Sequence, residues 1–396
     1  MKLRSFTKDD ISGKKVLVRV DFNVPLKDGS VADSTRILAH KETVSDLLKG
    51  GARVALCSHL GRPKGKRVPE MSLSLAREET ERVYEVPVKF CDDCIGPSVT
   101  ASLDGLGQGE LLLLENLRFY KEEQENDVDF ARKLAEPFEV FVMDAFSASH
   151  RADASTSAIM GILPSFSGSL LQREVEMLSA VSHDPKRPFV LILGGAKVSD
   201  KIGVIENLMD KANSILIGGG MAFTFIKAMG GSIGNSLLEE DRMDFAREML
   251  ERAKSLGADI ILPVDVLAGT SPDAERTEGP TPADEIPDGL MGLDIGPRTV
   301  SLFNEKIASA STILWNGPMG VFENPLFSAG TEGVAREVVK RTSGGGVSIV
   351  GGGDTAAAAR KLGFKDGVSH VSTGGGASLE FCEGKSLPGI APLVVD

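Results

Sequence analysis

The sequence lacks long apolar runs, abundant cysteine and any excess of basic charge. No stretch approaches the ~18 apolar residues of a membrane-spanning helix, and no apolar segment follows the charged N-terminus, which predicts a soluble, cytoplasmic protein without membrane contacts. Four cysteines in 396 residues are too few for a disulfide scaffold. The formal charge of −12 argues against nucleic acid as a partner.

Common signatures of metal, redox and nucleotide chemistry are missing or incomplete. Cys91 and Cys94 have the C-x-x-C spacing, but no second pair or nearby histidine accompanies them, which favours a surface turn without a metal or redox role. The phosphate loop G-x-x-x-x-G-K-[ST], the G-x-S-x-G elbow and the kinase H-R-D are absent. Any nucleotide site must therefore work without a phosphate-loop lysine.

The chain instead alternates short apolar runs with helical segments. Runs such as 16–20, 54–57, 111–114, 140–143 and 189–193 lack polar alternation, which is typical of strands buried in a parallel sheet. Helical periodicity follows, for example over 36–49. The length predicts two domains. We therefore expect an α/β fold of two similar-sized lobes, each a Rossmann-like parallel sheet flanked by helices, joined by a hinge.

Loop residues enclose a helical stretch near the middle of the sequence and mark the expected boundary. Proline and serine recur at 164–169 and 182–188, on either side of that stretch. We expect an N-terminal domain over 1–168, a connecting helix and hinge over 169–185, and a C-terminal domain over 186–385. The non-helical tail 386–396 is expected to pack back on another part of the chain.

Triple-glycine runs occur only in the second half, at 218–220, 344–346, 351–353 and 374–376. All but one lie between a strand-like run and a helix-like run, where bare backbone amides and a helix N-terminus favour phosphate. The run at 344–346 precedes its strand and predicts only a helix-to-strand turn. A further glycine turn at 194–195 leads into a helix flanked by Lys197 and Lys201, which either bind phosphate or are solvated.

Asp354 and Thr355, which follow the run at 351–353, allow two interpretations. The carboxylate is placed where a nucleotide's Mg²⁺ would lie, but the pair could equally cap the helix without any ligand. Gly351, Gly353 and Ala356 also match the dinucleotide fingerprint weakly, which leaves an NAD-dependent dehydrogenase as an alternative. A nucleotide-sensing protein without catalytic activity is another alternative.

Basic residues in the first half recur just past strands or at a helix start. Each alone is compatible with an ordinary surface charge. Together they could converge on one anionic small molecule, because guanidinium groups bind carboxylate and phosphate oxygens in pairs. The residues are Arg36, His59, Arg62, Arg118, His150 and Arg151.

These stretches together resemble the phosphoglycerate kinase family. The matching segments are 18–25, 35–37, 58–65, 115–119, 144–146 with 150–151, 194–201, 315–318 with 321–323, 351–355 and 372–376. They follow the family order and spread across nearly the whole chain. The resemblance implies reversible phosphoryl transfer between ATP and the carboxylate of 3-phosphoglycerate in glycolysis and gluconeogenesis, with 1,3-bisphosphoglycerate and ADP as the other pair.

The resemblance also implies Mg²⁺ bound with the nucleotide, a monomer, and direct in-line transfer after hinge closure. It implies phosphoglycerate binding in the N-terminal domain by Asp21, Phe22, Asn23, Arg36, His59, Leu60, Gly61, Arg62, Arg118 and Arg151. It implies nucleotide binding by Gly195, Lys201, Gly219, Gly292, Asn316, Pro318, Glu323, Gly352, Gly353, Asp354 and Thr355, with Asp354 on the metal. Catalytic roles are implied for Arg36, Lys197, Lys201, Gly375 and Gly376.

One segment departs from the usual family pattern. Ser147 stands where a glycine is common, and Asp153 replaces a second histidine. Arg151 is kept, so substrate binding is still expected. The carboxylate of Asp153 is expected to weaken the positive field at this position.

Overall fold

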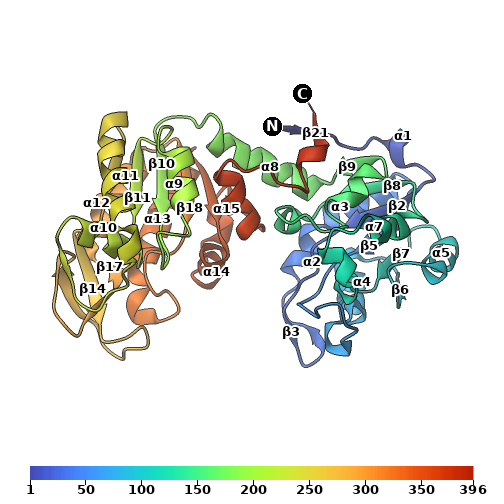
Figure 1. The fold of residues 1–396 in the computed structure, drawn as a ribbon, viewed down its shortest axis with the longest axis horizontal. Coiled ribbons are helices and arrows are strands. Elements are labelled where there is room, and N and C mark those ends of the chain that lie inside the picture. Colours follow the sequence, from blue (N-terminus) through green and yellow to red (C-terminus); the bar gives the residue numbers. More distant parts are fainter. Residues whose placement is uncertain (396) are drawn as a thin grey trace. The chain divides into compact units, whose positions relative to one another are not determined.

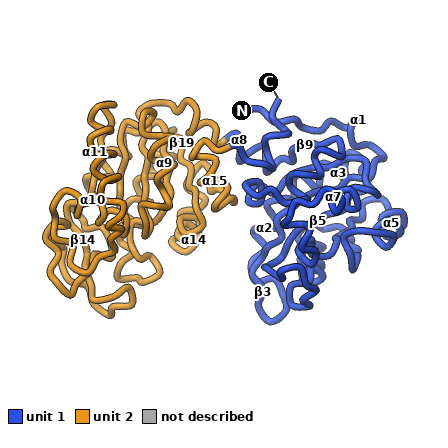
Figure 2. Tube along the Cα trace, in the orientation of Figure 1, with its two compact units in different colours: residues 1–176, 386–396 blue, residues 177–385 orange. Residues whose placement is uncertain are grey.

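The computed structural model describes residues 1–395, which form two compact units (Figures 1 and 2). Unit 1 comprises Met1–Glu176 and the tail from Ser386, and unit 2 comprises Met177–Lys385. Helix α8, Ser169–Ser182, passes from one unit to the other. None of the helices in residues 1–395 has the length and apolar character needed to cross a membrane.

Unit 1 is built on a six-stranded parallel sheet. Its strands, in spatial order, are β6 Val88–Cys91, β7 Leu111–Leu114, β5 Arg53–Cys57, β2 Lys15–Arg19, β8 Val140–Met143 and β9 Ser165–Ser167. Alternate residues of β2, β5, β7 and β8 join one apolar cluster with helix residues, and the intervening residues are buried too. Burial of both faces explains why these strands are continuous apolar runs in the sequence.

Helices and short hairpins complete unit 1. The helices are α1 Lys8–Ile11, α2 Thr35–Ala39, α3 Lys41–Lys49, α4 Arg77–Tyr84, α5 Pro97–Asp104, α6 Lys121–Gln124 and α7 Val128–Ala135. Strands β3 Leu26–Lys27 and β4 Ser30–Val31 form a hairpin. Strand β1 Lys2–Leu3 pairs antiparallel with β21 Val394–Val395, so the two ends of the described chain meet in this unit.

The helical segment expected over 36–49 is confirmed apart from one break, because the chain forms α2 and α3 on either side of His40. The backbone of His40 stays in the right-handed region, but its φ of −93° and ψ of −2° differ from those of a regular α-helix. Its imidazole is buried and hydrogen-bonded at both ring nitrogens. These tertiary bonds outweigh the local tendency to continue one helix.

Unit 2 contains a second six-stranded parallel sheet. Its strands, in spatial order, are β13 Asp259–Ile261, β11 Ser214–Ile217, β10 Phe189–Leu193, β18 Thr312–Asn316, β19 Val347–Gly351 and β20 His370–Val371. The expected two-sheet α/β fold is therefore confirmed. Trp315 lies in the core and stacks on Phe364 with ring centroids 5.3 Å apart.

Helices flank this sheet, and an additional antiparallel sheet was not predicted. The helices are α9 Ile202–Leu208, α10 Ala222–Ala228, α11 Met243–Leu256, α12 Pro297–Ser309, α13 Ala329–Ser343, α14 Gly353–Lys361 and α15 Gly376–Cys382. The additional strands are β14 Asp265–Gly269, β15 Glu278–Pro282 and β17 Met291–Ile295, with the small parallel pair β12 Ser232–Ile233 and β16 Glu285–Ile286.

The C-x-x-C segment bends and exposes Asp92, as a surface turn should, but its two cysteine side chains do not lie at the surface. Cys91 ends strand β6, and both Cys91 and Cys94 are buried. Burial raises the pKa of Cys94 well above its usual value, which keeps this thiol protonated and unreactive. By contrast, the run 344–346 ends α13 and precedes β19, as a helix-to-strand turn should.

Candidate active site

Polar loops leave neighbouring strands of unit 1 at the same edge of the sheet. Because β7, β5, β2 and β8 are adjacent and parallel, the segments after their carboxyl ends converge. Hydrogen bonds join these segments. The Gly61 amide donates to Asn23 Oδ1 at 2.9 Å, and Arg118 Nη1 donates to the Gly61 carbonyl at 3.1 Å. The predicted substrate residues from different loops are thus brought together.

Phe22 and Leu60 lie between these polar residues in the sequence and help to hold the loops in place. The Phe22 amide donates to Ser58 Oγ at 2.8 Å, and its ring is buried. Leu60 is buried as well, and its carbonyl accepts from Asn116 Nδ2 at 2.7 Å. Both residues fix the loops rather than present polar side chains.

Asp21 holds Arg36 at this edge. Arg36 Nη1 and the Ser147 hydroxyl both donate to Asp21 Oδ2, and the Asn23 amide donates to Oδ1 at 3.0 Å. Burial would raise the pKa of Asp21, but the neighbouring His59 and Arg36, together with these donors, outweigh burial and hold it below its usual value. The Arg36 side chain stays 40% exposed, so it can still bind an anion.

His59 lies buried in a cationic environment. Arg19 Nη2 lies 3.1 Å from His59 Nδ1, and a guanidinium group can only donate, so Nδ1 is the acceptor. Burial and the charge of Arg19 hold the pKa of His59 well below its usual value. A neutral His59 with its proton on Nε2 can donate a hydrogen bond without adding charge.

A buried Arg19–Ser155–Glu123 network, which the sequence did not reveal as part of the site, supports His59. Arg19 is fully buried at the last position of β2, and its Nε donates to Ser155 Oγ at 2.8 Å. Ser155 donates in turn to Glu123 Oε1 at 2.5 Å. Burial raises the pKa of Glu123 despite the nearby Arg19. The signal that could have revealed this network is Arg19 itself, a charged residue inside the apolar run 16–20.

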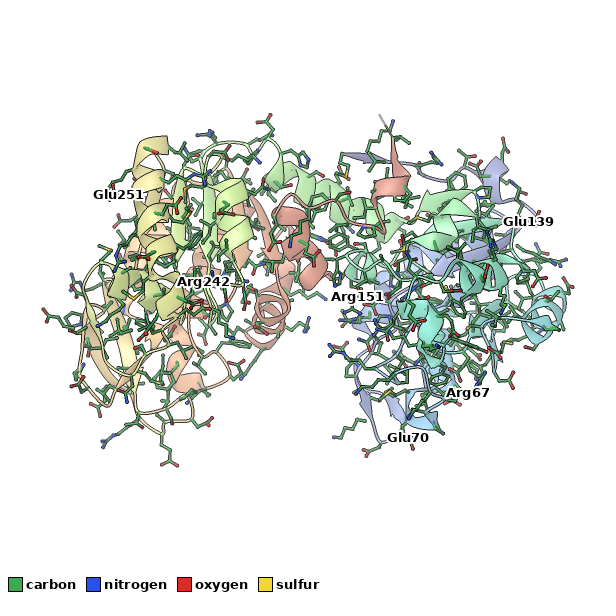
Figure 3. All side chains as sticks on the ribbon, viewed as in Figure 1. Arg67, Glu70, Glu139, Arg151, Arg242 and Glu251 are labelled. Atoms are coloured by element: carbon green, nitrogen blue, oxygen red, sulfur yellow. The ribbon has the colours of Figure 1, made fainter. Side chains whose placement is uncertain are left out.

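Arg118 and Arg151 form the rest of the cationic site, and Figure 3 labels Arg151 in unit 1. Arg118 is buried, and its Nη2 lies 3.8 Å from Asp153 Oδ2. Burial and the charge of Arg151 lower the pKa of Arg118. Arg118 Nε and Asp153 Oδ2 are buried without a hydrogen-bond partner. Arg62 is exposed at the surface of its loop.

A pocket of about 430 Å³ lies among the glycine turns of unit 2. Lys201 enters it, and its Nζ donates to Asn316 Oδ1 at 2.6 Å. Burial lowers the pKa of Lys201. The lining also includes Gly352, Gly353, Gly375 and Gly376. Gly352 has a φ of +88° and precedes α14, whose first-turn amides lack intrahelical acceptors, so the pocket favours an anion.

Asp354 and Thr355, at the start of α14, have different surroundings. The Thr355 hydroxyl is buried and accepts from the Gly317 amide at 2.6 Å, so it secures the turn after β18. Thr355 does not line the pocket of Lys201. Asp354 is exposed and lines a second pocket, where its carboxylate can take a metal ion.

This second pocket, of about 220 Å³, is mainly apolar. Gly219 has a φ of +65°, and a Cβ there would lie 2.7 Å from the Gly195 amide nitrogen. A Cβ at Gly292 would meet the Phe223 ring at 2.1 Å. Glycine at both positions thus allows close packing in the wall of this apolar slot. The slot is lined by Gly195, Gly219, Phe223, Leu237, Gly292, Pro318, Met319, Phe322 and Glu323.

Lys197 is exposed and lies outside both pockets, and its predicted role at the phosphates stays a prediction. Asp294, which the sequence did not single out, is buried beside the apolar slot and accepts from the Gly330 amide at 2.6 Å. Burial raises the pKa of Asp294 to about 8.

The parallel sheet of unit 2, with its two pockets among the loops, is typical of an α/β protein that binds a small ligand at the carboxyl ends of its strands. A family model described as phosphoglycerate kinase matches residues 6–385. The phosphoglycerate kinase of Thermosipho africanus (strain TCF52B) is 50% identical over 385 residues, covering 97% of this chain and 96% of the relative. That of Rubrobacter xylanophilus is 51% identical over 393 residues, covering 99% and 98%.

A solved structure leads to the same family. Phosphoglycerate kinase from Coxiella burnetii superposes with a TM-score of 0.88 at 40% identity, covering 99% of each chain. The chain belongs to the phosphoglycerate kinase family. It is therefore a glycolytic transferase that moves phosphate between ATP and 3-phosphoglycerate, and the dehydrogenase and nucleotide-sensor alternatives are set aside.

Proposed function

We propose that unit 1 binds 3-phosphoglycerate and that unit 2 binds the nucleotide. The convergence of the cationic loops on one edge of the unit 1 sheet carries the first assignment. Arg36 is held by Asp21 yet partly exposed, and Arg118 is buried with an unused Nε. Guanidinium groups so arranged suit a small molecule with a phosphate and a carboxylate.

The nucleotide assignment rests on the residues that line the two pockets of unit 2. The apolar slot suits adenine, and the exposed Glu323 in its lining suits the ribose. Lys201 and the amides around Gly352 and Gly353 suit the phosphates. The exposed carboxylate of Asp354 fits Mg²⁺, which usually takes one or two carboxylates together with phosphate oxygens. When bound, Mg²⁺ would neutralise phosphate charge.

The chemistry then requires positioning and charge neutralisation. The substrate carboxylate attacks the γ-phosphoryl in line, and no covalent enzyme intermediate forms. Arg36, Lys201 and the amides of Gly375 and Gly376 stabilise the charge on the transferring group. Closure of the protein around both substrates brings these groups together and excludes water, which would hydrolyse the acyl phosphate. Action as a cytoplasmic monomer is part of the same proposal.

Arg36→Ala tests the assignment of unit 1. We expect turnover to fall by about 10²–10³-fold, as for loss of one donor to transition-state charge. Affinity for MgATP should stay within about twofold, because Arg36 belongs to unit 1 and lines neither pocket of unit 2.

Arg132→Ala is the matched control, because Arg132 is 66% exposed and pairs with the nearby, exposed Asp129. Coupled-reductase assays would give turnover, and urea unfolding would report the fold. Equal turnover in the two folded variants would contradict the role of Arg36.

A further inference from the structure

His40, at the break between α2 and α3, links two carboxylate residues of unit 1. Its Nε2 accepts from the Asp21 amide at 2.9 Å. Its Nδ1 lies 2.7 Å from Asp144 Oδ2. The side chain of His40 is 1% exposed, so water does not compete for these bonds.

The two bonds determine where the imidazole proton lies. A backbone amide can only donate, so Nε2 of His40 must carry a lone pair. The proton therefore sits on Nδ1 and donates to Asp144. Asp144 selects this tautomer, and the tautomer in turn provides the acceptor for the Asp21 amide.

Asp144 is itself fixed by the start of α8. Its Oδ1 accepts from the amides of Leu170 and Leu171, at 3.1 and 3.3 Å. The preceding Gly168 allows this approach, because a Cβ there would lie 2.1 Å from Asp144 Oδ1. The carboxylate of Asp144 therefore cannot shift without disturbing the first turn of α8.

At the other end of the link, the position of the Asp21 backbone decides where its carboxylate points. That carboxylate accepts from Arg36 and Ser147. The neighbouring Phe22 ring lies against the His40 ring, with centroids 6.2 Å apart. A change at His40 would thus reach Arg36 through Asp21.

We propose that His40 is a positioning residue for phosphoglycerate: it fixes the Asp21 backbone against Asp144 and the start of α8, and so keeps Arg36 in place. The inference rests on the proposed function, because Arg36 is its point of action. Breaking the link leaves the nucleotide pockets of unit 2 untouched. The loss should therefore appear in the affinity for 3-phosphoglycerate and not in that for MgATP.

Nitrogen-15 NMR of the histidine rings tests the tautomer directly, and only five histidines need assignment. The expected spectrum of the full chain shows His40 with Nδ1 protonated and Nε2 unprotonated. A proton on Nε2 would overturn the inference, because the Asp21 amide would then lack its acceptor.

Asp144→Asn and His40→Phe test the functional consequence without creating a large cavity. Asp144→Asn replaces one carboxylate oxygen by an NH₂ group, which can only donate. That group must face another donor, either Nδ1–H of His40 or the backbone amides at the start of α8. The phenyl group introduced by His40→Phe keeps an aromatic ring and removes both hydrogen bonds. We expect KM for 3-phosphoglycerate to rise about tenfold, with KM for MgATP within about twofold, since tenfold corresponds to the ~1.4 kcal/mol of one such bond.

Thr43→Val is the matched control on α3. The Thr43 hydroxyl accepts from the Ser169 amide at 2.8 Å, at the same helix start, but does not contact Asp21. Valine should cost comparable stability in urea unfolding and leave both KM values unchanged. An equal rise in KM in this control, or no rise in folded Asp144→Asn protein, would reduce His40 to a structural role.

The wild-type assay separates failure of the inference from failure of the proposed function. If the wild type shows no 3-phosphoglycerate-dependent transfer, or if Arg36→Ala leaves turnover unchanged, the proposed function fails. The inference about His40 then fails with it, because it acts through Arg36. The inference alone is overturned if the wild type is active and Arg36→Ala lowers turnover, but Asp144→Asn leaves KM for 3-phosphoglycerate unchanged.

Discussion

Replacing Asp153 by Asn should tighten phosphoglycerate binding and lower the free energy of unfolding of the protein without substrate. Asp153 is the nearest counter-ion of the buried Arg118, with Nη2 and Oδ2 3.8 Å apart. In the free protein the pair is favourable. When an anion binds to Arg118, the carboxylate of Asp153 repels it. The substitution removes both effects and keeps the size of the side chain.

The separation of the pair sets the size of both effects. At an effective dielectric constant of ~20, unit charges at this distance attract by about 4 kcal/mol. Relaxation around Arg118 reduces the loss, so we expect the unfolding free energy to fall by about 2–3 kcal/mol. Like charges about 7 Å apart repel by about 2 kcal/mol on the same scale, and screening leaves a gain of about tenfold in affinity.

Calorimetric titration with 3-phosphoglycerate at low ionic strength, paired with urea unfolding, measures both quantities. Asp129→Asn is the matched control, because Asp129 is an exposed acidic residue of the same unit and changes the net charge equally. It should leave both quantities near wild type. If Asp153→Asn protein folds but binds phosphoglycerate no tighter than this control, Asp153 does not compete with the substrate, and the reasoning fails.

Two further predictions concern unit 2. Asp354→Ala should raise the magnesium concentration needed for half-maximal rate by about tenfold, because one carboxylate ligand is lost; an unchanged magnesium dependence would remove Asp354 from the metal role. Asp294 has a pKa raised from 3.8 to about 8 by burial, so the folded state binds a proton that the unfolded state has released. Its contribution to stability is present below the unfolded pKa and is lost as pH rises toward 8, by up to about 1.4 kcal/mol per unit. Urea unfolding between pH 5 and pH 8 should therefore show a steeper loss in wild type than in Asp294→Asn, and parallel pH profiles would contradict this assignment.

Much of the fold was predictable because buried parallel strands appear in the sequence as uninterrupted apolar runs. β7, β8 and β10 begin and end where their runs do. β9, with its short sequence Ser165–Ser167, has too few apolar residues to stand out. The antiparallel strands around β14 interrupt the βα alternation, and no local pattern indicates that they pair with each other.

The site was predictable where chemistry follows strand ends, and unpredictable where tertiary contacts decide. The glycine turns that line the unit 2 pockets and the arginine loops fall at the carboxyl ends of parallel strands, which must meet at one edge of each sheet. The break at His40 depends on partners far along the chain, at Asp21 and Asp144. The turn of the Thr355 hydroxyl toward Gly317 likewise depends on a contact between two loops.

The central claim is that each substrate has its own unit, and amide chemical-shift mapping with one substrate at a time tests it most directly. Adding 3-phosphoglycerate alone should shift the amides of Asn23, Gly61 and Arg151 and leave those of Gly219 and Gly353 unchanged. ADP with Mg²⁺ should do the reverse. Shifts from 3-phosphoglycerate that fall on the glycine turns of unit 2, with unit 1 unchanged, would contradict the account.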